Sequence, residues 1–153
     1  MRWKLVTWIT IFATNLSHIL VRKRPQSYAF KEYGQMAEGS LGRTYFQYLK
    51  SQNIPFKANL IRHDLKHVIL GYKMNMPDEL RIHAFLLGNR SYNLMAIAYL
   101  CLCVMIVPET LNMLKKDFKR GRGTECLKRI KFQDYVHNNL ENCRKKFKIS
   151  PLN

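Results

Sequence analysis

Residues 61–88 read IRHDLKHVILGYKMNMPDELRIHAFLLG, and their pattern predicts two helices with a break between them. Ile61 and Leu65 recur on one side of the first helix, as expected of a helix that packs on a core. Gly71 can end this helix, because glycine readily takes the left-handed conformation found at helix C-termini. Pro77 suits the first turn of a second helix, which we expect to continue to the end of the stretch.

The first of these helices carries two histidines four residues apart, His63 and His67. Side chains at i and i+4 lie about 40° apart around a helix, and Asp64 lies about 100° from His63, so all three project into one sector. Glu79 follows the break, in the first turn of the second helix, where the helix dipole favours an acid. Two facing helices would supply His63, His67 and Glu79 as metal ligands, with Asp64 as a fourth ligand or a proton acceptor.

Glu79 shares its helix face with Ile82, His83 and Leu86, so its charge opens a largely apolar stripe and needs a partner or a cation. His83 is expected behind the ligands as a hydrogen-bond partner, although a structural role is its simpler interpretation. A His-x-x-x-His pair alone usually means two surface histidines or two histidines satisfied in a core. The adjoining Asp64 and the position of Glu79 favour a metal site over that plainer interpretation.

Three segments of the chain resemble the member-four family of coenzyme Q (ubiquinone) biosynthesis proteins. The family pattern H-D-x-x-H, eleven residues, then E is carried without a departure by His63, Asp64, His67 and Glu79. Residues 37–45 (AEGSLGRTY) and 140–149 (LENCRKKFKI) resemble two further family segments, and all three occur in family order. Lys148 replaces the usual glycine of the last segment. The chain is also shorter than family members in the stretch between Tyr45 and His63.

This resemblance implies an all-α, membrane-associated, metal-containing protein of ubiquinone biosynthesis. It implies a part in removing the C1 carboxylate of a prenylated aromatic precursor and in hydroxylating that carbon. We therefore expect a metal-dependent, oxidative decarboxylase with Asp64 as its catalytic residue. The alternative is a non-catalytic, metal-stabilised lipid-binding scaffold that organises other quinone-biosynthesis enzymes. Two histidines and a carboxylate favour zinc, and iron is the alternative because zinc has no redox chemistry.

The resemblance also implies partners and a location. The expected partners are a prenylated quinone precursor or another isoprenoid lipid, an anionic membrane surface and other quinone-biosynthesis proteins, while a homodimer stays open. The expected location is peripheral on a membrane. In a bacterium this is the cytoplasmic side, and in a eukaryote the matrix side of the mitochondrial inner membrane.

The charge of the chain is strongly positive, with 26 Lys and Arg against 10 Asp and Glu among 153 residues, for a net charge of +16. An anionic partner is therefore expected. Nucleic acid is disfavoured, because the basic residues are spread over several helices without a recognition motif. The four cysteines lack zinc-type C-x-x-C spacing and predict buried thiols in a reducing compartment, not disulfides.

Residues 3–21 predict an amphipathic helix with a large apolar face. Packing of this face against the core is slightly favoured. The alternative is a helix that lies in a membrane interface, with lipid contact by Trp3, Trp8, Arg22, Lys23 and Arg24. We place this helix and its basic linker in residues 1–31, and the helical metal-binding domain in residues 32–153.

The remaining signals also favour helices, so the expected fold is all-α, a single-domain helical bundle. Ser40 can cap a helix that ends before Pro55. The apolar run 94–107 is too short to cross about 30 Å of hydrocarbon, and we expect a buried central helix that could line a lipid tail. The basic segment 115–123 is expected to be a solvated loop, with phosphate or lipid-headgroup binding as the alternative.

Overall fold

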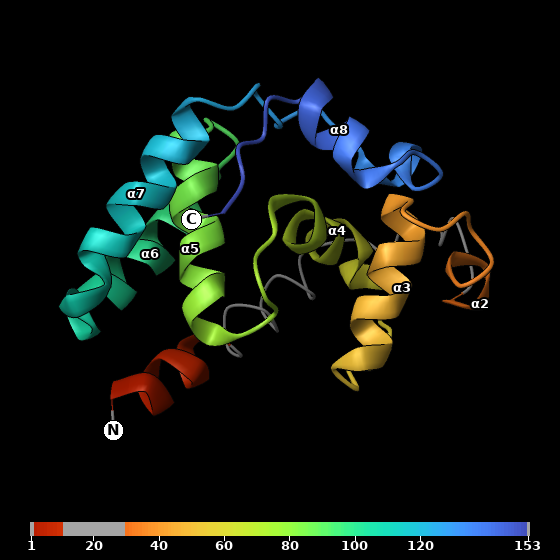
Figure 1. Ribbon diagram of the computed structural model, residues 1–153. Helices are drawn as coiled ribbons and strands as arrows, with labels where there is room; N and C mark the ends of the chain where they lie inside the picture. The colour runs from red at the N-terminus through yellow and green to blue at the C-terminus, as the bar shows by residue number, and fades with distance from the viewer. Residues whose placement is uncertain (1, 11–29, 153) are drawn as a thin grey trace. The chain divides into compact units, whose positions relative to one another are not determined.

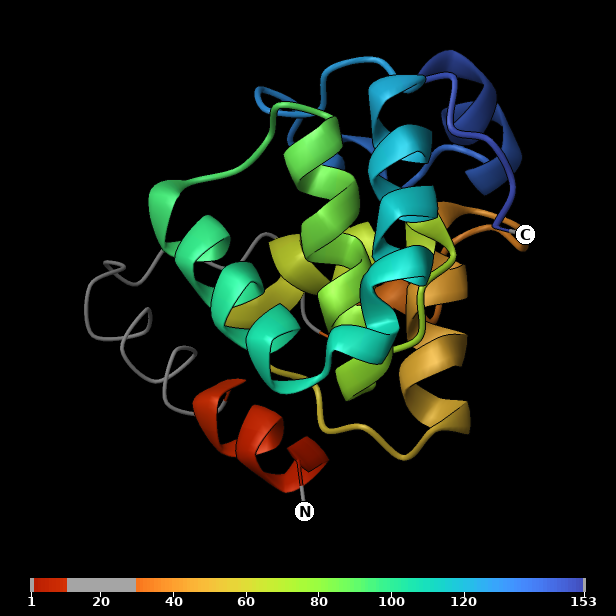
Figure 2. The ribbon, with the colours of Figure 1, turned by 90° about the vertical axis from the view of Figure 1, so that its left-hand side faces the viewer.

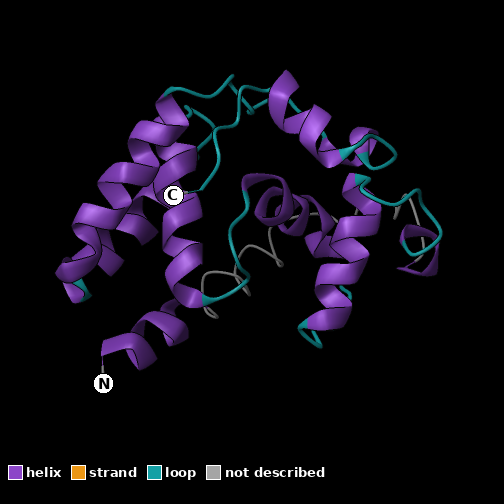
Figure 3. Ribbon diagram, in the orientation of Figure 1, coloured by secondary structure: helices purple, strands orange, loops and turns teal. Residues whose placement is uncertain are grey.

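The computed structural model describes residues 2–10 and 30–152 (Figure 1). Every regular element in this part of the chain is a helix, and its only strand-like feature is an isolated antiparallel bridge between Ser40 and Asn139. Figure 3 shows this helical content by colour. The prediction of an all-α fold is confirmed.

A helix of residues 2–10 precedes the labelled elements. The α-helices that follow are α2 (Phe30–Tyr33), α3 (Leu41–Ser51), α4 (Ile61–Leu70), α5 (Met76–Gly88), α6 (Leu94–Ile106), α7 (Leu111–Arg122) and α8 (Leu140–Lys146). Three short 3₁₀ helices lie between them, η1 (Ala58–Leu60), η2 (Pro108–Thr110) and η3 (Phe132–Tyr135).

The described residues fall into two compact units. The first unit contains residues 2–10 and 74–128, and the second contains residues 30–73 and 129–152. Each unit therefore combines segments that are distant in the sequence. The predicted boundary after residue 31 stays a prediction.

In the first unit, α5 packs against both α6 and α7. Both views of the ribbon show α5 and α7 side by side (Figures 1 and 2). Glycines permit this close approach, because a Cβ atom at Gly88 would collide with the carbonyl oxygen of Phe118, and one at Gly121 with that of Phe85. The backbones of the two helices can approach closely only because both positions lack a side chain.

An ion pair also joins α5 to α7. Arg81 donates from Nε to Oδ2 of Asp117 over 2.8 Å and from Nη2 to Oδ1 over 3.3 Å, and Asp117 is buried. A third bond runs from Arg81 Nη1 to Asp78 Oδ1 over 3.2 Å.

The prediction of a solvated loop at residues 115–123 is wrong. Most of it belongs to α7, because Leu114 and Asp117 bury one face of a helix while its lysines occupy the other.

The second unit contains α3, α4 and α8, and α4 contacts both of the others. Ser40 caps α3 as predicted, since its Oγ accepts from the backbone N–H of Arg43, and α3 ends at Ser51. Gly71 ends α4 with φ of 81°, and its N–H bonds the carbonyls of His67 and Val68. The predicted break between the two helices of residues 61–88 is therefore confirmed.

The prediction that the apolar run 94–107 is a buried central helix is wrong. Its helix, α6, buries only Tyr99, Leu100 and Cys103, and it exposes a continuous side. Because α6 has apolar residues on every side, its sequence does not distinguish the side that packs in the first unit from the side that is exposed. Within residues 2–10 and 30–152, no single helix has the length and apolar character to cross a membrane. Only α6 taken with segment 108–122 meets the two criteria, and this pair is bent by 110°.

Part of the predicted N-terminal amphipathic helix is described, as residues 2–10. Val6 is fully buried in the core of the first unit, whereas Trp3, Leu5 and Trp8 are exposed. Within residues 2–10, therefore, only part of the predicted apolar face packs against the core. The remainder of the predicted helix, and Arg22, Lys23 and Arg24, lie outside the described residues.

Candidate metal centre

Helix α4 presents His63 and His67 on the same side. Their ring centroids lie 4.7 Å apart, as the spacing of four residues requires. The core side of α4 includes Leu65 and Ile69, both fully buried, which fixes the rotation of the helix. Its C-terminal end is held by Arg144, whose guanidinium donates to the carbonyls of Val68 and Ile69 over 3.0 and 2.9 Å.

The imidazole of His67 is oriented by the backbone. Its Nδ1 lies 3.0 Å from the carbonyl oxygen of Lys73, and only 1% of the residue is exposed. A carbonyl oxygen only accepts, so Nδ1 carries the hydrogen and the lone pair of the neutral ring lies on Nε2. A neutral imidazole whose other nitrogen donates to an oxygen is the usual form of a histidine metal ligand.

The imidazole of His63 lies near a carboxylate. Its Nδ1 lies 3.5 Å from Oδ1 of Asp64, the next residue. The other carboxylate oxygen, Oδ2, accepts from the hydroxyl of Tyr45 over 3.1 Å, and both Tyr45 and Asp64 are buried. Burial and the Asp64 charge raise the pKa of Tyr45, so the phenol stays protonated and remains a donor to Asp64.

Helix α5 presents Glu79 in its first turn. The helix begins after Asn75, whose side-chain oxygen accepts from the N–H of Asp78, and Pro77 occupies the first turn as predicted. Glu79 Oε1 lies 3.3 Å from Nε2 of His83, and both side chains are mostly buried. Because His83 Nδ1 is buried without a hydrogen-bond partner in the described structure, the neutral ring with its hydrogen on Nε2, donating to Glu79, fits this site.

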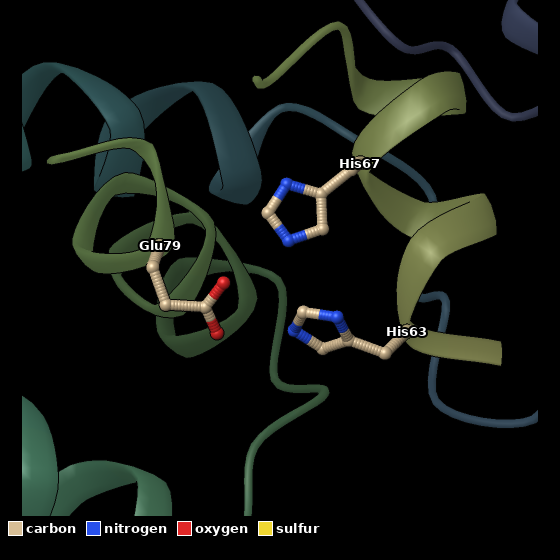
Figure 4. Close-up of side chains that lie close together, drawn as sticks. All are labelled: His63, His67 and Glu79. Carbon is tan, nitrogen blue, oxygen red and sulfur yellow. The ribbon is translucent and has the colours of Figure 1, made fainter. Parts of the chain in front are cut away.

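His63, His67 and Glu79 each offer one ligand atom, and these atoms all lie within 4.8 Å of one another (Figure 4). The donor set fits a divalent ion, because two neutral imidazoles and a carboxylate are common ligands of zinc and of related metals. The groups behind the ligands strengthen this fit, because Nδ1 of His67 bonds the backbone carbonyl of Lys73 and Nδ1 of His63 lies 3.5 Å from a carboxylate oxygen of Asp64. The cluster could therefore hold a metal ion.

Asp64 contributes no atom to this cluster, so its predicted part as a fourth ligand stays a prediction. The structure places it behind His63 and against Tyr45. Two groups next to the cluster, the hydroxyl of Tyr45 and the backbone carbonyl of Lys73, were not predicted from the sequence. Tyr45 lies in one of the family-like segments, but its position gave no sign of a bond to Asp64. The carbonyl of Lys73 is a backbone group, for which a sequence has no signal.

Comparisons with known proteins agree with the motif. The family model of coenzyme Q (ubiquinone) biosynthesis protein Coq4 matches residues 61–153, a range that includes all three cluster residues. A search of curated proteins returned no match.

A solved structure with a similar fold is the crystal structure of a protein from Nostoc punctiforme PCC 73102, named for a proposed role in ubiquinone biosynthesis. The similarity covers 90% of this chain and 75% of that chain, with a TM-score of 0.66 and 17% identity. At this identity the likeness shows the fold alone. The family match covers more than half of the chain, and the chain therefore belongs to the Coq4 family of coenzyme Q (ubiquinone) biosynthesis proteins.

Proposed function

We propose that this protein holds a divalent metal ion with His63, His67 and Glu79 and removes the C1 carboxylate of a prenylated aromatic precursor of ubiquinone. The observation that carries the proposal is the cluster of two imidazoles and a carboxylate in a chain of this family. The bound ion would supply a positive charge that holds the substrate's carboxylate or phenolate and stabilises the negative charge that develops as carbon dioxide leaves.

The residues around the ligands support the proposal by fixing which nitrogen of each ring faces the ion. Lys73 holds the Nδ1 hydrogen of His67 through its carbonyl, and Asp64 faces the Nδ1 of His63. Asp64 would also hold the Nδ1 hydrogen of His63 towards its carboxylate as charge develops in the site, while the hydroxyl of Tyr45 holds its second oxygen in place. His83 donates to Glu79 and limits the orientations of that carboxylate.

Removal of the C1 carboxylate can proceed in two ways, as simple decarboxylation or as oxidative decarboxylation. In simple decarboxylation the bond from C1 to the carboxylate breaks, the electron pair stays on the ring, and C1 takes a proton. In the oxidative form C1 gains a hydroxyl group, which consumes dioxygen and a two-electron reductant and forms water beside carbon dioxide. We propose zinc for the simple form. The oxidative form favours iron, which the same donor set also binds.

The test is turnover of a prenylated aromatic precursor that carries an isotopic label in its C1 carboxylate. Wild-type protein loaded with zinc or with Fe(II) should release labelled carbon dioxide, and mass spectrometry of the product distinguishes hydrogen from hydroxyl at C1. His67→Ala and Glu79→Gln should abolish release. His137→Ala is the matched control, because His137 is an exposed histidine outside the cluster and its removal should leave the rate unchanged.

Release of labelled carbon dioxide by all of these variants, or by none of the metal-loaded forms, would contradict the catalytic proposal. The second candidate is a lipid-binding scaffold, favoured by the exposed apolar residues of α6 and of helix 2–10. In that case metal removal should unfold the protein, and no loaded form should turn over the precursor. A folded, metal-bound Asp64→Asn variant without turnover would instead favour catalysis.

A further inference from the structure

Arg144 of α8 bonds the C-terminal end of α4. The last carbonyls of an α-helix have no partner within the helix itself. The backbone N–H that follows α4 bonds the carbonyls of His67 and Val68. Arg144 donates from Nη2 to the carbonyl of Val68 and from Nε to that of Ile69, although 75 residues separate Arg144 from Ile69 in the chain. Arg144 therefore helps to close the last turn of α4, which is the turn that carries His67.

The chemistry of the Arg144 side chain suits this position. The C-terminal end of a helix carries a partial negative charge, so a cation there is stabilising. The planar guanidinium donates to two neighbouring carbonyls at once, which the single ammonium of a lysine does not reproduce. Arg144 is itself held in place, because its Nη1 donates to Oε1 of Glu141 over 2.6 Å and only 26% of its side chain is exposed. Cys143, the next residue towards the N-terminus, is buried and fixes the rotation of α8.

The end of α4 continues directly into the group that orients His67. Gly71 ends the helix, and the carbonyl of Lys73, two residues further on, lies 3.0 Å from Nδ1 of His67. A Cβ atom at Gly71 would lie 3.7 Å from Nη2 of Arg144, so the guanidinium lies beside this turn. The path of the turn decides where the Lys73 carbonyl lies relative to the imidazole. It therefore also decides which nitrogen of His67 is left for the cluster.

We propose that Arg144 is a positioning residue of the metal centre, which acts through the end of α4 and the turn to Lys73. It keeps the Nδ1 hydrogen of His67 on the Lys73 carbonyl and thereby leaves Nε2 to bind the ion. The inference rests on the proposed metal site, and the bonds from Arg144 to the two carbonyls of α4 carry it. Loss of a group behind a metal ligand lowers affinity about 10-fold to 100-fold. Arg144 acts one step further back, so the lower end of this range is expected.

The first test measures zinc affinity by competition with a chromophoric chelator. Arg144→Gln should bind zinc about tenfold more weakly than the wild type. Lys145→Gln is the matched control, because it makes the same charge change at the next residue of α8, which is exposed. It should have the affinity of the wild type. An unchanged affinity in Arg144→Gln, or an equal loss in both variants, would overturn the proposal.

The second test observes His67 in the metal-free protein. ¹⁵N NMR of histidine-labelled protein, at a pH where the rings are neutral, distinguishes a hydrogen on Nδ1 from a hydrogen on Nε2. The His67 signals are assigned by their absence in His67→Ala. The wild type and Lys145→Gln should carry the hydrogen on Nδ1, and Arg144→Gln should show a mixture. Unchanged His67 signals in folded Arg144→Gln would overturn the proposal, whatever its zinc affinity. A wild type that binds no zinc while Arg144→Gln still shows the mixture would contradict the metal site and not the role of Arg144 in orienting His67.

The third test separates positioning from stability. Ser40→Ala removes the cap of α3 and should destabilise the fold without changing a contact of Arg144. It should keep the zinc affinity and the His67 signals of the wild type, with urea unfolding as the measure of stability. A loss of affinity in Ser40→Ala equal to that in Arg144→Gln would overturn the proposal.

Arg144→Lys keeps the positive charge at the end of α4 without the two-pronged donor. It should lose less zinc affinity than Arg144→Gln and show a smaller share of His67 with its hydrogen on Nε2. If Arg144→Gln does not fold, Arg144→Lys replaces it in the first two tests. Wild-type affinity together with wild-type His67 signals in that variant would then overturn the proposal.

Discussion

Helices α4 and α6 differ in what their sequences determine. In α4, apolar residues alternate with histidines and charged residues, so only one rotation of the helix buries its apolar side. In α6, all thirteen residues are apolar or aromatic, and any rotation would bury an apolar side. The burial of α4 was accordingly predicted correctly, and that of α6 was not. Residue types predict a buried face only where a helix contains contrasting residues.

The largest expected effect tests this difference with one substitution made at two places. Leu65→Ala in α4 removes a fully buried side chain and should lower the free energy of unfolding by about 2–5 kcal/mol. Leu94→Ala in α6 should change it by less than about 0.5 kcal/mol, because Leu94 is largely exposed. Urea unfolding followed by circular dichroism measures both values. Similar losses at the two positions would mean that the outer side of α6 is covered in the folded protein.

The next effect concerns the candidate metal centre, to which α4 contributes two histidines. Asp64→Asn keeps the shape of the side chain but removes the charge that faces His63 Nδ1. Loss of such a partner lowers metal affinity about 10-fold to 100-fold. Competition with a chromophoric chelator measures the affinity. Asp134→Asn, at an exposed position of η3, is the control and should have the affinity of the wild type.

A smaller effect is expected for the residue behind Asp64. Tyr45→Phe removes the hydroxyl that donates to Asp64 Oδ2 and leaves a buried carboxylate oxygen with one partner fewer. The free energy of unfolding should fall by about 1–2 kcal/mol. Metal affinity should fall as well, although less than in Asp64→Asn. If Tyr45→Phe lowers stability and leaves metal affinity at the wild-type value, the tyrosine supports only the fold.

The smallest effect is a dependence on pH. Burial raises the pKa of Tyr45 and of Tyr99 above the ordinary value of 10.0. Above pH 10 the unfolded chain ionises at these tyrosines and the folded protein does not, so stability that is fully present below pH 10 is lost as the pH rises further. The loss should approach about 1.4 kcal/mol per pH unit for each tyrosine. Unfolding curves between neutral pH and pH 11 would show it, and Tyr45→Phe should reduce the slope. An equal slope in wild type and variant would mean that Tyr45 ionises while folded.

The parts predicted from the sequence are those with local signals. Gly71 and Pro77 mark the end of α4 and the start of α5, and the spacing of His63 and His67 places both on one side of a helix. The parts that were missed depend on residues distant in the chain. The helix at 115–123 buries Asp117 against Arg81, and a run of lysines gives no sign of that partner.

The same reason applies to the surroundings of the candidate metal centre. Tyr45 reaches Asp64 from another helix, and Lys73 contributes its backbone carbonyl, a group that every residue has. The sequence could therefore predict the three residues of the cluster, but not the groups that orient them. For α6 the limit is different, since a uniformly apolar helix contains no information on which side faces the protein.

Metal analysis of the purified protein tests the central claim most directly. Elemental analysis should find about one divalent ion per chain in the wild type and in His137→Ala, as expected for a single site with three protein ligands. His67→Ala and Glu79→Gln should retain almost none after dialysis while remaining folded by circular dichroism. A wild-type protein that binds no ion when supplied with zinc or Fe(II), or variants that keep the full content, would contradict a metal site built from His63, His67 and Glu79.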